Sequence, residues 1–226
     1  MAMRSSSSRS TARSLQRLRR EYTRGSLEER RAPADPLMLF RRWLSAAIAG
    51  GLPEPHAMTL ATATRNGRPS ARIVLLKRAD RRGFTFGTNY ESRKGRELAA
   101  NPQGELVFFW SALDRQVRIR GRLSRTTQAE SRVIFSRRPR ASQLAAWASP
   151  QSGRLPDRAA LEARVAEVAR RFEGGPVPLP PFWGGYRLVP REIEFWQGRM
   201  NRLHDRLLYA RSAGGRGGWR VVRLAP

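Results

Sequence analysis

Residues 193–206 combine two aromatic side chains with two carboxylates, three arginines and one of the two histidines in the chain. A strand that only filled a core would not carry so many ionisable groups beside an aromatic pair, because each costs free energy when it is buried without a partner. If the stretch is extended, the spacing of Arg202, His204 and Arg206 puts all three side chains on one face. Such a face suits a flat anionic ligand, since arginine binds phosphate and histidine binds a ring heteroatom. The simpler alternative is a solvated charged strand with Trp196 in the core.

The composition excludes several kinds of site. A chain of 226 residues can bury a sizeable core, as one large domain or two small ones. It has no cysteine, so disulfides, thiolate metal sites and cysteine nucleophiles are excluded. No metal site is expected. No membrane span is expected either, because no apolar stretch approaches the length of a span. The first 20 residues lack an apolar signal region, so a cytoplasmic location is the default. Residues 1–17 are predicted to be a disordered basic tail, although an organellar transit peptide has a similar composition.

The net charge of +26 raises the possibility of a nucleic-acid partner. Against it, the arginines are scattered through every segment rather than gathered in one patch. We therefore expect no specific nucleic-acid partner, while non-specific binding at low salt stays open. The chain has only two lysines, Lys77 and Lys94. Positions that keep lysine amid so much arginine indicate a need for a compact ammonium group.

Hydrophobic periodicity and turn residues predict an α+β fold in which helices are inserted between antiparallel strands of a barrel-like domain. Asp35 and Pro36 mark the start of a helix that ends at Gly50. Thr127 and Glu130 form a capping box at the start of another. Further helices are predicted over 92–100, 142–148 and 157–172, and strands over 57–64, 70–77, 84–88, 105–110, 116–123, 185–189, 191–197, 207–211 and 219–224.

The Ser-Arg-Lys sequence at 92–94 is unusual for a helix start. If Ser92 caps the helix, Arg93 and Lys94 lie in its first turn, where the helix dipole disfavours cations. A bound anion would reverse that effect and use the free backbone N–H groups. The alternative is a frayed surface turn.

Several segments, in the same order, resemble the pyridoxamine 5′-phosphate oxidase family from about residue 18 to the C-terminus. They are residues 20–25, 33–36, 72–77, 92–94, 136–143, 182–185, 193–206 and 223–226. The resemblance implies a split β-barrel of the FMN-binding type with surrounding helices, formed by residues 18–226 as a single domain. It also implies a homodimer with FMN at the subunit interface. The implied reaction is oxidation of pyridoxine or pyridoxamine 5′-phosphate by O₂ to pyridoxal 5′-phosphate and hydrogen peroxide, a step of vitamin B6 salvage.

The same resemblance assigns roles to individual residues. Those implied for FMN are Arg72, Ile73, Val74, Leu75, Leu76, Lys77, Thr88, Arg93, Lys94, Gln116, Gln151, Ser152, Trp196 and Arg206. Those implied for the substrate are Lys77, Arg138 and Ser142 at its phosphate, Arg202 and His204 at its ring, and Arg19 and Tyr22 in an N-terminal segment that closes over the ligand. Arg202 and His204 are the implied catalytic residues.

Two positions depart from the family pattern, because Ile134 and Gly87 stand where tyrosines are usual. They leave an alternative open, a related flavin oxidase of the phenazine-biosynthesis type that acts on a non-phosphorylated ring. Ile134 favours that alternative mildly, whereas Arg138 and Ser142 favour a phosphorylated substrate. A flavin- or pyridoxal-phosphate-binding protein without turnover, or a basic nucleic-acid binder, is a further alternative.

Overall fold

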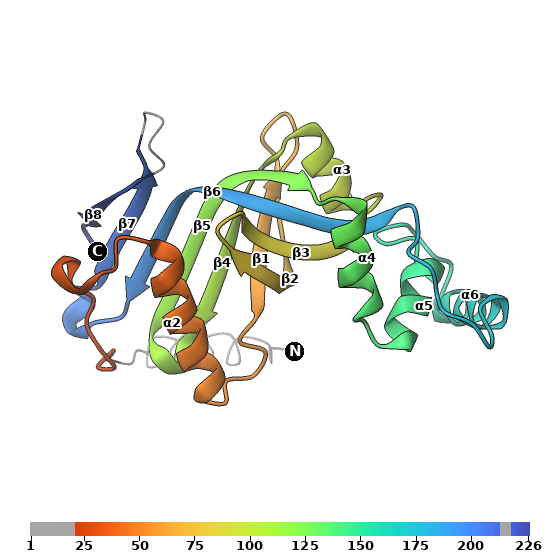
Figure 1. The fold of residues 1–226 in the computed structure, drawn as a ribbon, viewed down its shortest axis with the longest axis horizontal. Coiled ribbons are helices and arrows are strands. Elements are labelled where there is room, and N and C mark those ends of the chain that lie inside the picture. The colour runs from red at the N-terminus through yellow and green to blue at the C-terminus, as the bar shows by residue number, and fades with distance from the viewer. Residues whose placement is uncertain (1–20, 213–217) are drawn as a thin grey trace, which may run out of the picture.

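The computed structural model describes residues 21–212 and 218–226, and an eight-stranded antiparallel sheet dominates them (Figure 1). The strands are β1 (Ala57–Ala63), β2 (Pro69–Asp80), β3 (Gly83–Asn89), β4 (Gln103–Trp110), β5 (Arg115–Arg125), β6 (Trp183–Gln197), β7 (Asp205–Arg211) and β8 (Trp219–Leu224). Their order is β3-β2-β1-β4-β5-β6-β7-β8, and an additional β3–β6 pairing closes the first six into a barrel. The α+β, barrel-like fold predicted from the sequence is confirmed.

Five α-helices and three short 3₁₀ turns connect the strands of the described chain. The helices are α2 (Pro36–Ala49), α3 (Arg93–Ala100), α4 (Gln128–Ser136), α5 (Arg140–Ala148) and α6 (Arg158–Arg171). The 3₁₀ turns are η1 (Glu29–Arg31), η2 (Ser111–Leu113) and η3 (Met200–Arg202). Helices α4, α5 and α6 lie at one end of the long axis of the molecule, and β7 and β8 lie at the other (Figure 1).

The sequence predicts two strands on either side of Pro190, but the structure has one continuous strand, β6. The first part of β6 pairs with β3 as far as Leu188, and the second part pairs with β7 from Glu192 onward. Pro190 falls in the gap between these two partners, where no strand on that side needs its missing N–H. On the other side it faces a register shift of β5 between Arg120 and Gly121. The proline is therefore tolerated in the middle of a long strand.

Helix α2 supplies the centre of the core. The Asp35 side chain accepts a hydrogen bond from the Leu37 backbone N–H at 2.9 Å, so the predicted cap forms. Phe40 is fully buried, with its ring centroid 4.9 Å from that of Phe84 and 5.1 Å from that of Phe108, both in edge-on arrangements. One face of α2 is thus buried against the aromatic side chains of the barrel core.

Helices α4, α5 and α6 form a smaller packing unit beside the barrel. The Thr127–Glu130 capping box is present at the start of α4, as predicted. Helix α6 has the amphipathic spacing that the sequence shows, yet none of its residues is fully buried. Its end packs through Phe172, whose ring lies 5.3 Å from that of Trp147 on α5.

Within the described residues, no helix is long and apolar enough to cross a membrane. In the same part of the chain, no group of three or more histidine or carboxylate side chains is arranged to hold a metal ion.

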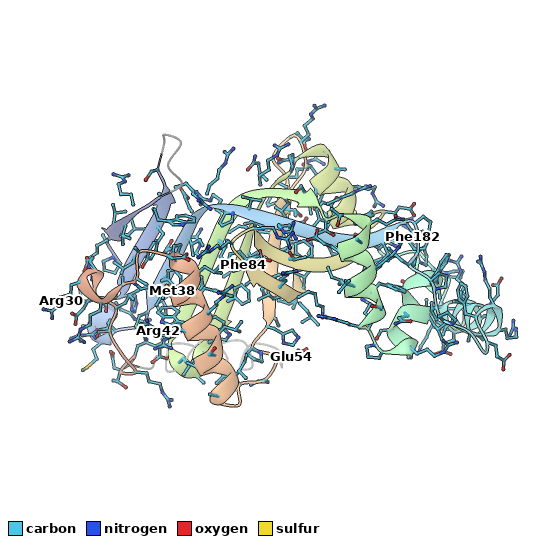
Figure 2. All side chains as sticks on the ribbon, in the orientation of Figure 1. Arg30, Met38, Arg42, Glu54, Phe84 and Phe182 are labelled. Atoms are coloured by element: carbon cyan, nitrogen blue, oxygen red, sulfur yellow. The ribbon has the colours of Figure 1, made fainter. Side chains whose placement is uncertain are left out.

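The packing of Phe40 gives a stability prediction. We expect Phe40→Ala to lower the free energy of unfolding by about 3–5 kcal/mol, because it removes a large ring from between two others and leaves a cavity. Met38 lies on the same helix, points away from the barrel and is 56% exposed (Figure 2). Met38→Ala should therefore change stability by less than about 0.5 kcal/mol. Denaturant unfolding of both variants measures the difference, and equal losses would contradict this account of the core.

Candidate active site

Two cavities lie between the barrel and the helices beside it. The α3 cavity has a volume of about 410 Å³, and its lining includes Lys77, Gly87, Thr88, Lys94, Arg138 and Gln151. The α4 cavity has a volume of about 550 Å³, and its lining includes Lys77, Thr85, Ile134, Arg138, Ser142 and Arg187. Lys77 and Arg138 line both, so the cavities share a cationic wall.

The α3 cavity is built around a buried lysine. Lys94 is 9% exposed, and its Nζ donates to Gln151 Oε1 at 2.9 Å and to Ser92 Oγ at 3.3 Å. Burial, with the charge of Arg72 as a second cause, lowers the pKa of Lys94 to about 8. Neither a carboxylate lining the cavity nor an ion pair within the described residues compensates this ammonium. The cavity therefore has the electrostatics of an anion site.

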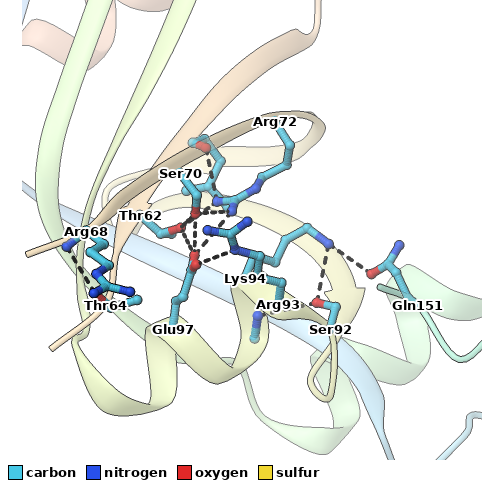
Figure 3. Close-up of polar contacts among 12 residues, drawn as sticks. Thr62, Thr64, Arg68, Ser70, Arg72, Ser92, Arg93, Lys94, Glu97 and Gln151 are labelled. Carbon is cyan, nitrogen blue, oxygen red and sulfur yellow. Dashed lines mark hydrogen bonds and ion pairs between the residues drawn. The ribbon is translucent and has the colours of Figure 1, made fainter. Parts of the chain in front are cut away.

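Of the two cations in the first turn of α3, only one has a carboxylate partner within the described chain. Ser92 caps the helix, and Arg93 is paired with Glu97 one turn later at 2.9 Å. Lys94 has no such partner and points toward Gln151 (Figure 3). The unfavourable cation of the first turn is thus the one that faces the cavity.

Arg138 holds the wall between the cavities. Its guanidinium lies 4.9 Å from the ring centroid of Trp183, and its Nη2 donates to the Ser142 carbonyl at 2.8 Å. Its Nε is buried without a hydrogen-bond partner in the described chain, as are Thr85 Oγ1 and Arg187 Nε. All three atoms belong to residues that line the α4 cavity. Buried donors without partners are rare in native proteins, so this cavity is suited to a ligand with several acceptor oxygens.

The residues assigned to the substrate phosphate are brought together. Lys77, Arg138 and Ser142 all line the α4 cavity, although they come from β2, the α4–α5 connection and α5. Lys77 stands at a register shift between β2 and β3, where the bulge lies next to the wall that both cavities share.

The residues assigned to the flavin fall into two groups. Those that line the α3 cavity are Ile73, Val74, Leu75, Lys77, Thr88, Lys94 and Gln151. Arg72, Leu76, Arg93 and Ser152 are close in sequence but do not line it, and the Leu76 side chain packs in the core. Gln116, Trp196 and Arg206 form the second group, in register across β5, β6 and β7.

The Arg206 side chain of the second group is held by two hydrogen bonds. Its Nε donates to Glu194 Oε1 at 2.8 Å and its Nη1 to the Ala225 carbonyl at 2.8 Å. Glu194 also accepts from Arg118 at 3.2 Å. Since the guanidinium is held from two sides, it is presented in one orientation.

The expectation that Arg202, His204 and Arg206 share one strand face is wrong. Only Arg206 lies in β7, while Arg202 belongs to the η3 turn and has a left-handed backbone (φ 63°), as does Asn201 (φ 54°). The turn is closed by hydrogen bonds from Leu203 N–H to the Met200 carbonyl and from His204 N–H to the Arg202 carbonyl. Local turn bonds thus replace the extended ladder that the spacing implied.

His204 stays near the second group through ring contacts. Its ring lies 4.7 Å from that of Trp196 and 5.5 Å from that of Tyr22, and the Arg202 guanidinium is 5.8 Å from the Tyr22 ring. Nδ1 of His204 accepts a hydrogen bond from the Arg199 N–H at 3.1 Å. Burial and then the charge of Arg202 lower the pKa of His204. Because Nδ1 accepts a hydrogen bond, the neutral form of the ring carries its proton on Nε2. Nε2–H is left as a donor to a ligand.

Arg19 and the predicted tail at 1–17 lie outside the described residues.

The two groups stand at opposite ends of β6. Trp183, beside the α3 cavity, is the first residue of β6, and Trp196 is the last but one. Thirteen steps of about 3.3 Å give a strand path of up to about 43 Å between them. The α3 and α4 cavities are lined by members of the first group, and neither is lined by Gln116, Trp196 or Arg206. One copy of the chain therefore does not bring the complete predicted set together.

Sequence reasoning did not single out Trp183 as a site residue. A Cβ on Gly87 would lie 2.6 Å from Trp183 Cη2 and 3.3 Å from Ile134 Cγ2. Gly87 is therefore the residue that makes room for the indole, and it adjoins Ile134. The available signals were the family-like segment 182–185, which contains Trp183, and the absence of tyrosine at positions 87 and 134.

Comparison with solved structures defines the class of protein. PhzG from Burkholderia lata 383, solved in complex with tetrahydrophenazine-1-carboxylic acid, matches with a TM-score of 0.82 and 36% identity over 88% of this chain and 98% of that one. A pyridoxamine 5′-phosphate oxidase-related, FMN-binding protein from Nostoc punctiforme has the same fold, with a TM-score of 0.66 and 20% identity over 83% and 97% of the two chains. The fold is an α+β split barrel of the FMN-binding type.

Sequence comparison then gives the family. The model described as pyridoxamine 5′-phosphate oxidase matches residues 44–172, and that of the pyridoxine 5′-phosphate oxidase C-terminal dimerisation region matches residues 183–226. A pyridoxine/pyridoxamine 5′-phosphate oxidase from Rubrobacter xylanophilus is 60% identical over 95% of this chain and 97% of its own length. One from Burkholderia thailandensis is 56% identical over 92% and 97%. The chain belongs to the pyridoxine/pyridoxamine 5′-phosphate oxidase family, a family of oxidoreductases.

Membership supports FMN as the cofactor, and the dimerisation region supports a homodimer. The α3 cavity fits the phosphate of FMN, because Lys94 and Lys77 supply charge that no lining carboxylate cancels. Gln151 can both donate to and accept from the flavin.

The lowered pKa of Lys94 gives a pH prediction. Its ammonium is charged at pH 7 and loses its proton above about pH 8, while the FMN phosphate, with a second pKa near 6, stays dianionic. The Kd of the apoprotein for FMN should therefore rise as pH increases from 7 to 9.5, approaching tenfold per pH unit above 8. Flavin fluorescence quenching measures it, with riboflavin as the control that lacks a phosphate. A Lys94→Met variant should bind FMN weakly with a flat profile, and an equal slope in both proteins would show that another group titrates.

Proposed function

We propose that this protein is an FMN-dependent oxidase that converts pyridoxine or pyridoxamine 5′-phosphate to pyridoxal 5′-phosphate, as part of vitamin B6 salvage. The observation that carries the proposal is the pair of neighbouring cationic cavities with a common wall, Lys77 and Arg138. An oxidase of this kind needs two phosphate sites close together, one for the cofactor and one for the substrate. The α3 cavity suits the first and the α4 cavity the second.

The proposed enzyme is a homodimer in which each site takes one group of residues from each copy. Two observations support this arrangement. The groups lie at opposite ends of β6, and Ile73 of β2 (64% exposed) and Phe109 of β4 (58% exposed) share one open face of the sheet. Large apolar side chains on an open sheet face favour coverage by another surface. A two-fold dimer would cover the face of both copies and complete two equal sites.

Bound FMN supplies a two-electron acceptor for the hydride from C4′ of the substrate, and O₂ takes up the electrons to give hydrogen peroxide. For pyridoxine 5′-phosphate the balance is alcohol plus O₂ to aldehyde plus hydrogen peroxide. For pyridoxamine 5′-phosphate one water is also consumed and ammonia is released.

The residues of this chain bind and orient the substrate. Lys77, Arg138 and Ser142 hold its phosphate in the α4 cavity, with the unpartnered Nε of Arg138 as one donor. From the other copy, His204 donates its Nε2–H to the pyridine ring or its substituents, and Arg202 stabilises charge that develops near C4′. Tyr22 contacts both His204 and Trp196 through its ring and helps to exclude water from that side.

The second candidate is a flavin oxidase that acts on a non-phosphorylated ring. The similarity to PhzG over 88% of this chain favours it, as does the apolar Ile134 in the wall of the α4 cavity. The cationic wall of that cavity favours a phosphorylated substrate instead.

Hydrogen peroxide release tests the function. We expect turnover with pyridoxamine 5′-phosphate and little with pyridoxamine, which lacks the phosphate. Arg202→Ala should lower kcat/KM by about 100-fold or more at unchanged flavin content, because it loses a charge-stabilising group at the reacting carbon. Arg191→Ala, at an exposed position of β6, is the matched control and should leave both unchanged. Faster turnover of the unphosphorylated ring would favour the second candidate, and no turnover with either would argue for a binding protein.

Ile134 gives a separate prediction about substrate affinity. A tyrosine at this position of the α4 cavity would donate a hydrogen bond to the substrate phosphate, typically worth about 1.5–3 kcal/mol. The phosphate is remote from C4′, so this bond should act on ground state and transition state alike. Ile134→Tyr is expected to lower KM for pyridoxamine 5′-phosphate by about tenfold or more with kcat little changed. An unchanged KM in steady-state kinetics would mean that the phosphate is already satisfied or binds elsewhere.

A further inference from the structure

A buried carboxylate stands behind the flavin-phosphate site. The Glu97 side chain is 5% exposed and accepts four hydrogen bonds, from Thr62 at 2.5 Å, Ser70 at 2.6 Å, Arg93 at 2.9 Å and Arg72 at 3.2 Å (Figure 3). No role in the function proposed above uses this residue. Its environment is nevertheless more elaborate than helix capping or core packing requires.

The two carboxylate oxygens serve different arginines. Oε1 accepts from Arg93 Nε, whereas Oε2 accepts from Arg72 Nη2 and from both hydroxyls. Arg93 is one residue before Lys94 on α3, and Arg72 is close enough that its charge acts on Lys94. Glu97 therefore connects Arg72, whose charge acts on the buried ammonium, with Arg93, the residue that precedes Lys94 on α3.

Arg72 is held through both of its terminal nitrogens. Its Nη1 donates to Thr62 at 2.5 Å and to the Leu60 carbonyl at 3.3 Å, and its Nη2 donates to Ser70 at 2.6 Å and to Glu97. Among the described residues, no hydrogen bond uses its Nε. A guanidinium fixed in this way keeps donor capacity in a set direction.

Glu97 is a permanent anion in this environment. Burial raises the pKa of Glu97, but the hydrogen bonds from Ser70, Thr62, Arg93 and Arg72 outweigh that effect and lower it to about 2. Because two of its partners are hydroxyls of β1 and β2, the carboxylate is anchored to the barrel as well as to the arginines.

We propose that Glu97 is a positioning residue for the phosphate of FMN: it fixes Arg72 and Arg93, which adjoin the lining residues Ile73 and Lys94 of the α3 cavity, so that their guanidinium groups act on the phosphate held by Lys94. The proposal rests on the FMN site of the proposed function. The change in FMN affinity that positioning predicts for loss of Glu97 is opposite in sign to the change that charge alone predicts. Removing a negative charge from a cationic cluster should tighten anion binding by Coulomb attraction, whereas loss of positioning should weaken it.

The test compares two flavins in one variant. Glu97→Gln keeps the shape of the side chain and removes its charge. We expect the Kd of the apoprotein for FMN to rise about tenfold or more, by analogy with residues that orient metal ligands, whose loss costs about 10–100-fold in affinity. The Kd for riboflavin, which has no phosphate, should change less than about twofold. Quenching of flavin fluorescence gives both constants.

Two further variants make the comparison specific. Glu162→Gln removes a carboxylate with the same four-residue spacing to an arginine, in the exposed Arg158–Glu162 pair of α6, and should leave both constants unchanged. Ser70→Ala removes one hydroxyl shared by Glu97 and Arg72 and should weaken FMN in the same direction, which keeps the proposal testable if Glu97→Gln does not fold.

The outcomes distinguish failure of the role of Glu97 from failure of the FMN site itself. If the unaltered protein binds neither flavin, the FMN site itself is wrong. If it binds FMN but Glu97→Gln binds FMN equally or more tightly, Glu97 does not position the arginines. Equal losses for FMN and riboflavin would show a general structural role and also overturn the proposal.

Discussion

The architecture depends on the hydrogen bonding of one strand, β6, to three others. Its first part closes the barrel against β3, its second part carries β7, and β5 accompanies it along its length. Because the barrel is closed through β6, Trp183 and Trp196 are fixed at the two ends of a rigid element. The division of the candidate site into two groups is therefore built into the fold. A loop movement cannot bring the two groups together, and in the proposed homodimer the second copy would complete the site.

Charge in this protein is informative where it is unbalanced. Arg72, Arg93 and Arg206 each have a carboxylate partner, and the partners Glu97 and Glu194 are themselves nearly buried. Such pairs set geometry more than they add stability, since desolvation offsets much of their attraction. Within the described chain Lys77, Lys94 and Arg138 have no ion pair, and they meet in the two cavities. The net charge of +26 alone would have pointed to nucleic acid, whereas the α3 cavity, which has no lining carboxylate, suits a small anion.

Local features of the fold were predictable and non-local ones were not. The caps at Asp35 and Thr127 depend on side chains within three residues, and both form as the sequence predicts. Pro190 was misread because its tolerance depends on where β3 stops and β7 begins. The common face of Arg202 and His204 was misread because the turn at 200–204 is closed by its own backbone bonds.

The site shows the same limit. The family-like motifs implied which residues bind FMN, and seven of these residues line the α3 cavity. No spacing along the chain could show that Gln116, Trp196 and Arg206 lie at the other end of the sheet. Nor could the sequence reveal Glu97, because its partners Thr62 and Ser70 come from strands that precede it by about thirty residues.

The two departures from the family pattern are best understood as one structural change. Gly87 leaves space that Trp183 fills, and Ile134 packs against the same region. Trp183 in turn supports the Arg138 guanidinium at 4.9 Å. A side chain added at position 87 would collide with the indole and thereby disturb Arg138, so the effects of residues 87 and 134 on the cavities cannot be additive. The wall that the two cavities share is thus held by the contact between the Trp183 indole and the Arg138 guanidinium.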